Sequence, residues 1–134
     1  MPHMVILYTP NIEAHTDMTA LCRAMAETMV AQRDDMDKPV YPVGGTRVLA
    51  FAAAHYAVAD SSGDYGFVYL NVRMGAGRAD AVKQRIGDAL VARAREHFAP
   101  LLAERAVGIT LQIDESAGQA YDGKLGNLHA LFTR

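Results

Sequence analysis

Pro2 is the residue of this 134-residue sequence with the most unusual chemical potential. Inside a chain, a proline nitrogen is a tertiary amide without useful basicity, but at a free amino terminus it is a secondary amine that accepts a proton. An α-amino group titrates at roughly 7.7–8.0, and burial beside positive charge lowers that pKa toward the range of a general base at neutral pH. Pro2 is therefore a candidate catalytic base if Met1 is removed. The plainer interpretation is that it is an incidental second residue.

Two arginines follow glycine-containing segments, in Gly44-Gly45-Thr46-Arg47 and Gly75-Ala76-Gly77-Arg78. A guanidinium group offers a rigid fork of donors that matches a carboxylate, and the glycines let the backbone approach a ligand closely. Neither segment contains G-x-G-x-x-G or G-x-x-x-x-G-K-[ST], so phosphate binding is weakly supported. Arg47 and Arg78 are candidate carboxylate-binding residues, with surface ion pairing as the alternative.

The other reactive residue types indicate little chemistry. The five histidines show no H-E-x-x-H pair and no cysteine at metal-ligand spacing, so we expect no metal site and no cofactor. Cys22 falls on an apolar helical stripe, which favours a buried, inert thiol. Ser61 and Ser62 lie in a turn without a nucleophile-elbow motif, which leaves hydrolase chemistry unsupported.

Composition limits the class of protein. The hydrophobic content of 51% with 21% charged residues predicts one packed domain over residues 1–134. A formal charge of -2 argues against a nucleic-acid partner, and no apolar run approaches the ~18–20 residues that span a bilayer. One cysteine cannot form an internal disulfide and no signal peptide is recognisable, so a cytoplasmic location is the default expectation.

Hydrophobic periodicity predicts two β-α-β units. The first unit begins with a strand over residues 4–8. A helix follows from Met18 to about Arg33, with Thr16 or Asp17 as its N-cap. A second strand then covers residues 46–51 and continues toward Tyr56. In the second, residues 67–74 alternate as a strand, a helix runs from about Ala79 to Phe98 with Pro100 just beyond its end, and residues 107–114 alternate again.

These units predict an α+β fold, with a four-stranded sheet and both helices on one face, because each crossover is right-handed. The other face then needs cover, since Phe67 and Tyr69 project to it and no further helices remain. Oligomerisation through that face is the expected answer. The apolar terminal segment 127–132 is a candidate for pairing with a neighbouring subunit.

Four segments together resemble the 5-carboxymethyl-2-hydroxymuconate isomerase family of the tautomerase superfamily. They are Met1-Pro2-His3, Tyr41-Pro42 through Gly45-Thr46-Arg47, Asp64-Tyr65-Gly66-Phe67-Val68 running into Gly75-Ala76-Gly77-Arg78, and Asn127-Leu128-His129-Ala130-Leu131-Phe132. The resemblance spans nearly the whole chain. It implies a homotrimer of two β-α-β units that acts without cofactor or metal in bacterial degradation of 4-hydroxyphenylacetate through homoprotocatechuate.

The resemblance also implies residue roles. Pro2 would accept the 2-hydroxyl proton of a di- or tricarboxylate dienol and return it at C5, giving the conjugated keto isomer. Arg47 and Arg78 would hold carboxylates and stabilise charge on the 2-oxygen. Two alternatives stay open: a superfamily hydratase or dehalogenase of unsaturated acids, in which a prolyl cation acts as the acid, and a catalytically silent oligomeric ligand-binding protein in which Met1 caps Pro2.

Overall fold

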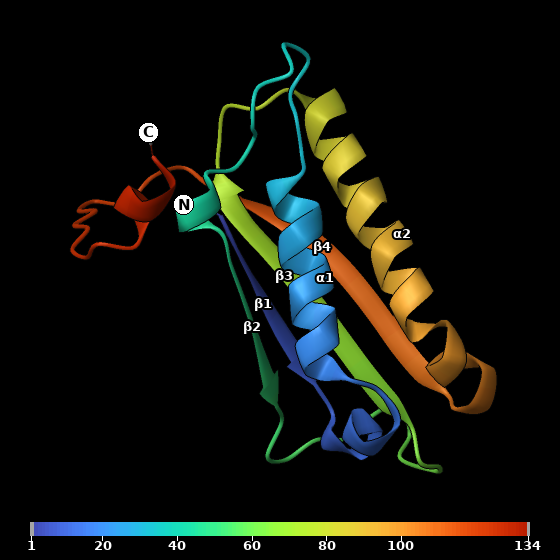
Figure 1. The fold of residues 1–134 in the computed structure, drawn as a ribbon. Coiled ribbons are helices and arrows are strands. Elements are labelled where there is room, and N and C mark those ends of the chain that lie inside the picture. The colour runs from blue at the N-terminus through green and yellow to red at the C-terminus, as the bar shows by residue number, and fades with distance from the viewer. Residues whose placement is uncertain (1, 134) are drawn as a thin grey trace.

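A mixed four-stranded sheet organises the computed structural model, which describes residues 2–133 (Figure 1). The elements in chain order are β1 (His3–Tyr8), η1 (Pro10–His15), α1 (Met18–Val30), η2 (Val43–Gly45), β2 (Arg47–Ala52), β3 (Gly66–Gly75), α2 (Asp80–Glu104), β4 (Val107–Ser116) and η3 (His129–Phe132). The sheet order is β2-β1-β3-β4; β1 runs parallel to β2 and antiparallel to β3, and β3 runs parallel to β4. The predicted α+β fold of two β-α-β units is confirmed.

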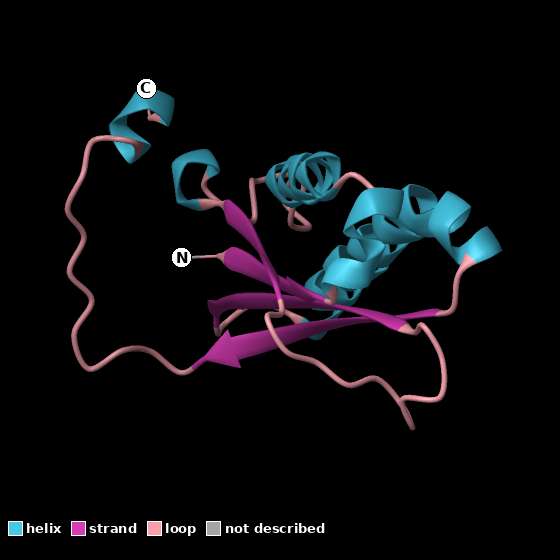
Figure 2. Cartoon of the chain, turned by 90° about the horizontal axis from the view of Figure 1, so that it is seen from below, coloured by secondary structure: helices cyan, strands magenta, loops and turns pink. Residues whose placement is uncertain are grey.

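Both long helices cover the same face of the sheet, as Figure 2 shows. The core lies between them and the sheet, where β3 contributes Val68, Leu70, Val72 and Met74, each at most 2% exposed. Their neighbours Phe67, Tyr69, Asn71 and Arg73 are half-buried or exposed on the opposite face, so the predicted alternation is correct. Helix α1 begins after Asp17, whose side chain accepts a hydrogen bond from the Ala20 N–H at 3.0 Å.

The predicted end of the second helix at Phe98 is wrong, because α2 continues to Glu104 with Pro100 inside it. Proline in a helix interior removes one backbone donor and usually breaks the helix. Here Leu101, only 3% exposed, adds one more turn to the buried face of α2, while Pro100 is exposed to solvent. Burial of Leu101 therefore outweighs the cost of the proline.

Two other predicted ends also need correction. Helix α1 ends at Val30 rather than near Arg33, because Gln32 and Arg33 turn to pair with the following loop: the Gln32 carbonyl accepts from the Val40 N–H, and Arg33 forms a bridge with Pro39. Strand β2 stops at Ala52 and does not continue toward Tyr56. Its partner β1 ends at Tyr8, so residues further along have no strand to pair with.

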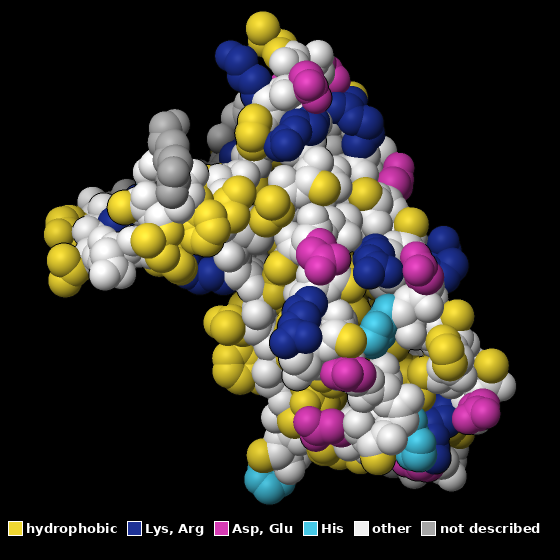
Figure 3. All heavy atoms as spheres, in the orientation of Figure 1, with side chains coloured by type: hydrophobic (Ala, Val, Ile, Leu, Met, Phe, Trp, Pro, Cys, Tyr) yellow, Lys and Arg dark blue, Asp and Glu magenta, His cyan; other side chains and the backbone are white. Residues whose placement is uncertain are grey.

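The sheet face opposite the helices, called the open face below, exposes several large apolar side chains. Leu7, Leu49, Phe51 and Phe67 are 37–52% exposed there. In Figure 3 hydrophobic side chains gather over the C-terminal turn and along the β2 edge. None of the helices within residues 2–133 is long and apolar enough to cross a membrane.

After β4, residues 117–128 form an arm without regular structure that ends in η3. The arm leaves the end of β4, passes around the amino-terminal end of β1 and returns to the side of η2 (Figure 2). The C-terminal turn η3 therefore packs against η2, close to the start of the chain.

Candidate active site

Pro2 is buried at the start of the inner strand β1. The next residue, His3, pairs with Arg47 on β2 and with Arg73 on β3, so Pro2 enters the sheet between the ends of these two strands. Met1, the other part of this sequence motif, lies outside the described residues.

The two glycines of η2 separate Pro2 from the C-terminal turn. A Cβ atom added to Gly45 would lie 4.0 Å from Pro2 Cδ and 3.0 Å from Pro42 Cγ. A Cβ atom added to Gly44 would lie 2.7 Å from His129 Cα and 3.1 Å from His129 Nδ1. Only glycine therefore lets the chain bring η3 this close to η2, next to the buried proline.

Arg78 is half-buried and fixed by backbone carbonyls rather than by an acidic partner. Its Nη1 donates to the Gly75 carbonyl at 2.9 Å and its Nη2 donates to the Val40 carbonyl at 3.0 Å. The guanidinium carbon lies 5.5 Å from the centre of the Tyr41 ring, in a cation–π arrangement. These bonds use two of five N–H donors, so the others are available to a ligand.

Tyr41 connects Arg78 with the Pro2 end of the sheet. It is fully buried, and its hydroxyl donates to Met74 Sδ at 3.1 Å. Burial raises the pKa of the Tyr41 phenol, and the positive charge of Arg78 opposes that rise. No pattern in the sequence indicates a role for Tyr41, although it stands at the start of the Tyr41-Pro42 segment.

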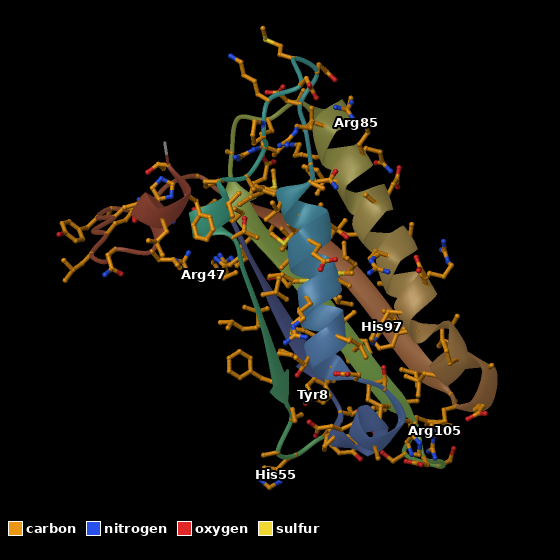
Figure 4. The ribbon with its side chains drawn as sticks, viewed as in Figure 1. Tyr8, Arg47, His55, Arg85, His97 and Arg105 are labelled. Carbon is orange, nitrogen blue, oxygen red and sulfur yellow. The ribbon has the colours of Figure 1, made fainter. Side chains whose placement is uncertain are left out.

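Arg47 lies exposed at the end of β2 that adjoins η2 (Figure 4). Its Nη1 donates to the Gly45 carbonyl at 2.9 Å, which turns the guanidinium toward η2. Neither Arg47 nor Arg78 belongs to any of the ion pairs formed among residues 2–133. The alternative of surface ion pairing is thus absent for both within this part of the chain.

The three predicted site residues come from one end of the sheet but approach it from two sides. Arg78 lines a cleft of about 550 Å³ together with other residues of the 76–82 segment and with residues of the 34–40 loop, among them Asp34 and Asp35. Neither Pro2 nor Arg47 lines that cleft, and Arg47 projects from the open face instead. Within residues 2–133, no group of three or more His, Cys, Asp or Glu side chains is placed to hold a metal ion.

The sheet order and the two helices on one face define a tautomerase-like fold. Residues 2–132 match the family described as 5-carboxymethyl-2-hydroxymuconate isomerase. The chain belongs to this family and is an isomerase.

Known members of the family are similar along the whole chain. A solved 5-carboxymethyl-2-hydroxymuconate delta-isomerase is 52% identical with a TM-score of 0.94, and the match covers 100% of this chain and 94% of that one. A second solved isomerase, from Deinococcus radiodurans R1, is 35% identical with a TM-score of 0.84, over 99% and 95% of the two chains. The 5-carboxymethyl-2-hydroxymuconate Delta-isomerase of Escherichia coli is 28% identical over 98% of this chain and 99% of its own.

Proposed function

We propose that the chain converts 5-carboxymethyl-2-hydroxymuconate to its 2-oxo-3-ene isomer by proton transfer through Pro2. The observation that carries this proposal is the burial of Pro2 at the start of β1, beside η2. A buried secondary amine is shielded from water, and neighbouring guanidinium groups favour its neutral, basic form. The reaction belongs, in this proposal, to aromatic catabolism through 4-hydroxyphenylacetate and homoprotocatechuate, in the cytoplasm.

The proposed step is a proton transfer between Pro2 and the substrate. The Pro2 nitrogen takes the proton of the 2-hydroxyl group, the electron pair moves through the conjugated system, and the prolyl cation returns the proton to C5. One O–H bond breaks and one C–H bond forms, so the product is an isomer. Arg47 and Arg78 hold carboxylates, and a guanidinium beside the 2-oxygen stabilises the negative charge that develops there.

A homotrimer of one tautomerase-like domain per chain is part of this proposal. Leu49 and Phe51 on β2, each about half exposed, and the apolar side chains of the C-terminal arm leave the single chain with uncovered hydrophobic surface. Contact between copies would bury this surface and bring a neighbour's residues near the site. Light scattering of the purified protein tests it, with a mass close to three chains expected and a monomer as the contrary result.

The decisive experiment compares the free and the blocked proline. Mass spectrometry first establishes that Met1 is absent from the active preparation. The ultraviolet change of the dienol is then followed with the wild type, with Pro2→Ala, and with a variant that carries one extra alanine between Met1 and Pro2. That insertion keeps the proline ring but turns its nitrogen into an amide without basicity.

We expect the insertion variant to lose almost all activity and Pro2→Ala to lose a large part of it. A wild-type rate in the insertion variant would exclude Pro2 as the base. Turnover of a chloroacrylate in place of the dienol would instead support the hydratase or dehalogenase alternative.

A further inference from the structure

Three basic side chains stand in one row across the open face of the sheet, at the end where Pro2 lies. His3 on β1 is in register with Arg47 on β2 and with Arg73 on β3. Residues in register on neighbouring strands project from the same face, with Cβ atoms about 4.5–5.5 Å apart. Arg47, His3 and Arg73, called the basic row below, therefore place two guanidinium groups on either side of an imidazole at the end of the sheet where β1 begins.

Among the residues that the structure describes, the two arginines of the basic row form no ion pair with a carboxylate. The ion pairs formed within residues 2–133 include neither of them. Asp114 on β4 is the register partner of Arg73, but its Oδ2 accepts a hydrogen bond from Asn71 Nδ2 at 2.9 Å. Arg47 and Arg73 flank His3 on its two neighbouring strands, so an anion bound over the row would meet two guanidinium groups.

The row is close to the proposed reaction centre. His3 directly follows Pro2, and consecutive Cα atoms are about 3.8 Å apart. The C-terminal arm begins beyond β4 and returns to η2, so its path runs around this end of the sheet (Figure 2). Arg47, which the proposed function assigns to a substrate carboxylate, is itself a member of the basic row, so a ligand that reaches Arg47 also lies near His3 and, one strand further, Arg73.

The proposed substrate carries one more carboxylate than the two arginines already assigned to it. Muconate contributes two carboxylates and the carboxymethyl group contributes a third. We infer that Arg73, assisted by His3, binds this third carboxylate and so sets the preference of the site for the tricarboxylate over the simpler 2-hydroxymuconate. This inference rests on the proposed function. Arg73 does not touch the reacting atoms, so it determines specificity rather than acting as a catalytic residue.

A comparison of two dienols tests the inference. For each of the wild type, Arg73→Gln, Arg73→Lys and the control Arg95→Gln, kcat and KM are measured on 5-carboxymethyl-2-hydroxymuconate and on 2-hydroxymuconate. Arg95 is an exposed arginine of α2. Hydrogen bonds to a charged partner are strong enough that Arg73→Gln should lower kcat/KM on the tricarboxylate roughly 10- to 100-fold, mainly through KM.

On 2-hydroxymuconate, Arg73→Gln should match the wild type, Arg73→Lys should recover part of the loss on the tricarboxylate, and Arg95→Gln should change neither reaction. His3→Gln should show the same selectivity as Arg73→Gln with a smaller effect. Equal losses on both dienols, or no loss on either, would overturn the inference.

Binding of unreactive acids separates this inference from the proposed reaction. Calorimetry compares tricarballylate, which has three carboxylates, with glutarate, which has two. Arg73→Gln should weaken tricarballylate binding about tenfold or more and leave glutarate unaffected. This result in a protein that turns over neither dienol would keep the carboxylate site and refute the proposed reaction.

If the wild type turns over the tricarboxylate normally and Arg73→Gln binds tricarballylate as tightly as the wild type does, the proposed reaction stands and the inference about Arg73 is refuted. Dissociation of the assembly in Arg73→Gln, detected by light scattering, would assign the row to a contact between copies of the chain and refute the inference.

Discussion

Replacing Gly44 with alanine should release the C-terminal turn without unfolding the core. The added Cβ atom would lie 2.7 Å from His129 Cα, which is a backbone atom and cannot rotate away. To reach 3.4 Å, the lower limit of ordinary contact, η3 must shift by about 0.7 Å. The side chains of η3 and the residue before it hold the turn only partly, since Leu128 and Phe132 are 48% and 53% exposed.

Those exposures limit the size of the effect. A fully buried leucine or phenylalanine contributes about 1.5–3 kcal/mol, so two half-buried ones together contribute about as much as one, roughly 1.5–3 kcal/mol. This free energy is what η3 loses when it separates from η2, so the substitution cannot lower the free energy of unfolding by more than this amount. Because 1.4 kcal/mol changes a population tenfold, the undocked fraction should rise roughly tenfold or more.

Limited chymotrypsin digestion measures the release, with cleavage near Leu128 and Phe132 expected to be roughly ten times faster in Gly44→Ala. Gly87→Ala is the matched control, because its added Cβ atom would meet Ile113 at an ordinary 3.6 Å. Urea unfolding of the core should remain cooperative in both variants. Cleavage of Gly44→Ala at the wild-type rate would refute the close packing of η3 on η2.

Three further predictions concern stability. The Tyr8 phenol is buried and donates to Glu13 Oε1 at 2.7 Å, and desolvation with this carboxylate raises the Tyr8 pKa to about 12. The unfolded phenol ionises near 10, so stability should fall as the pH rises from about 10 to 12, and urea unfolding of Tyr8→Phe should lack this part of the decline. Burial lowers the pKa of His97, whose Nε2 lies 3.0 Å from Thr16 Oγ1. The folded state therefore favours the neutral imidazole, and the stability it contributes is fully present above about pH 6.5 and is lost as the pH falls below that value. His97→Gln should make the free energy of unfolding less dependent on pH in this range. Pro100→Ala should raise the free energy of unfolding by about 1–3 kcal/mol, because alanine restores a helix donor at an exposed site, and an unchanged or lower melting temperature would contradict this.

The sequence pattern predicts most of the fold because burial on this sheet follows simple periods. Residues 67–74 alternate between the core and the open face, and Met18, Leu21, Met25 and Met29 of the α1 stripe are buried. Cys22 on the same stripe is only partly buried, so the expectation of a buried thiol is met in part. The ends of elements were less predictable because they depend on partners distant in the sequence. Pro100 stays helical because Leu101 finds a place in the core, and β2 stops where β1 ends.

The candidate site shows the same limit. Pro2, Arg47 and Arg78 can be selected by residue type and by the glycines beside the arginines. Tyr41 and Arg73 cannot, because their importance comes from strand register and from the fold of the 34–45 connection. A pairing such as His3 with Arg73 joins residues 70 positions apart, and local spacing carries no information about it.

The interior position of β1 has a consequence for the order of events during synthesis. Although β1 is made first, it cannot be enclosed until residues 66–75 have emerged to form its antiparallel neighbour. At about 5–20 residues per second, the ribosome leaves the amino terminus accessible for several seconds. An aminopeptidase must work within that interval if folding then shuts the terminus away. The rate of synthesis thus limits the time available for cleavage before Pro2. A molecule that folds before it is cleaved would have to unfold locally at the start of β1 before an aminopeptidase could act on it.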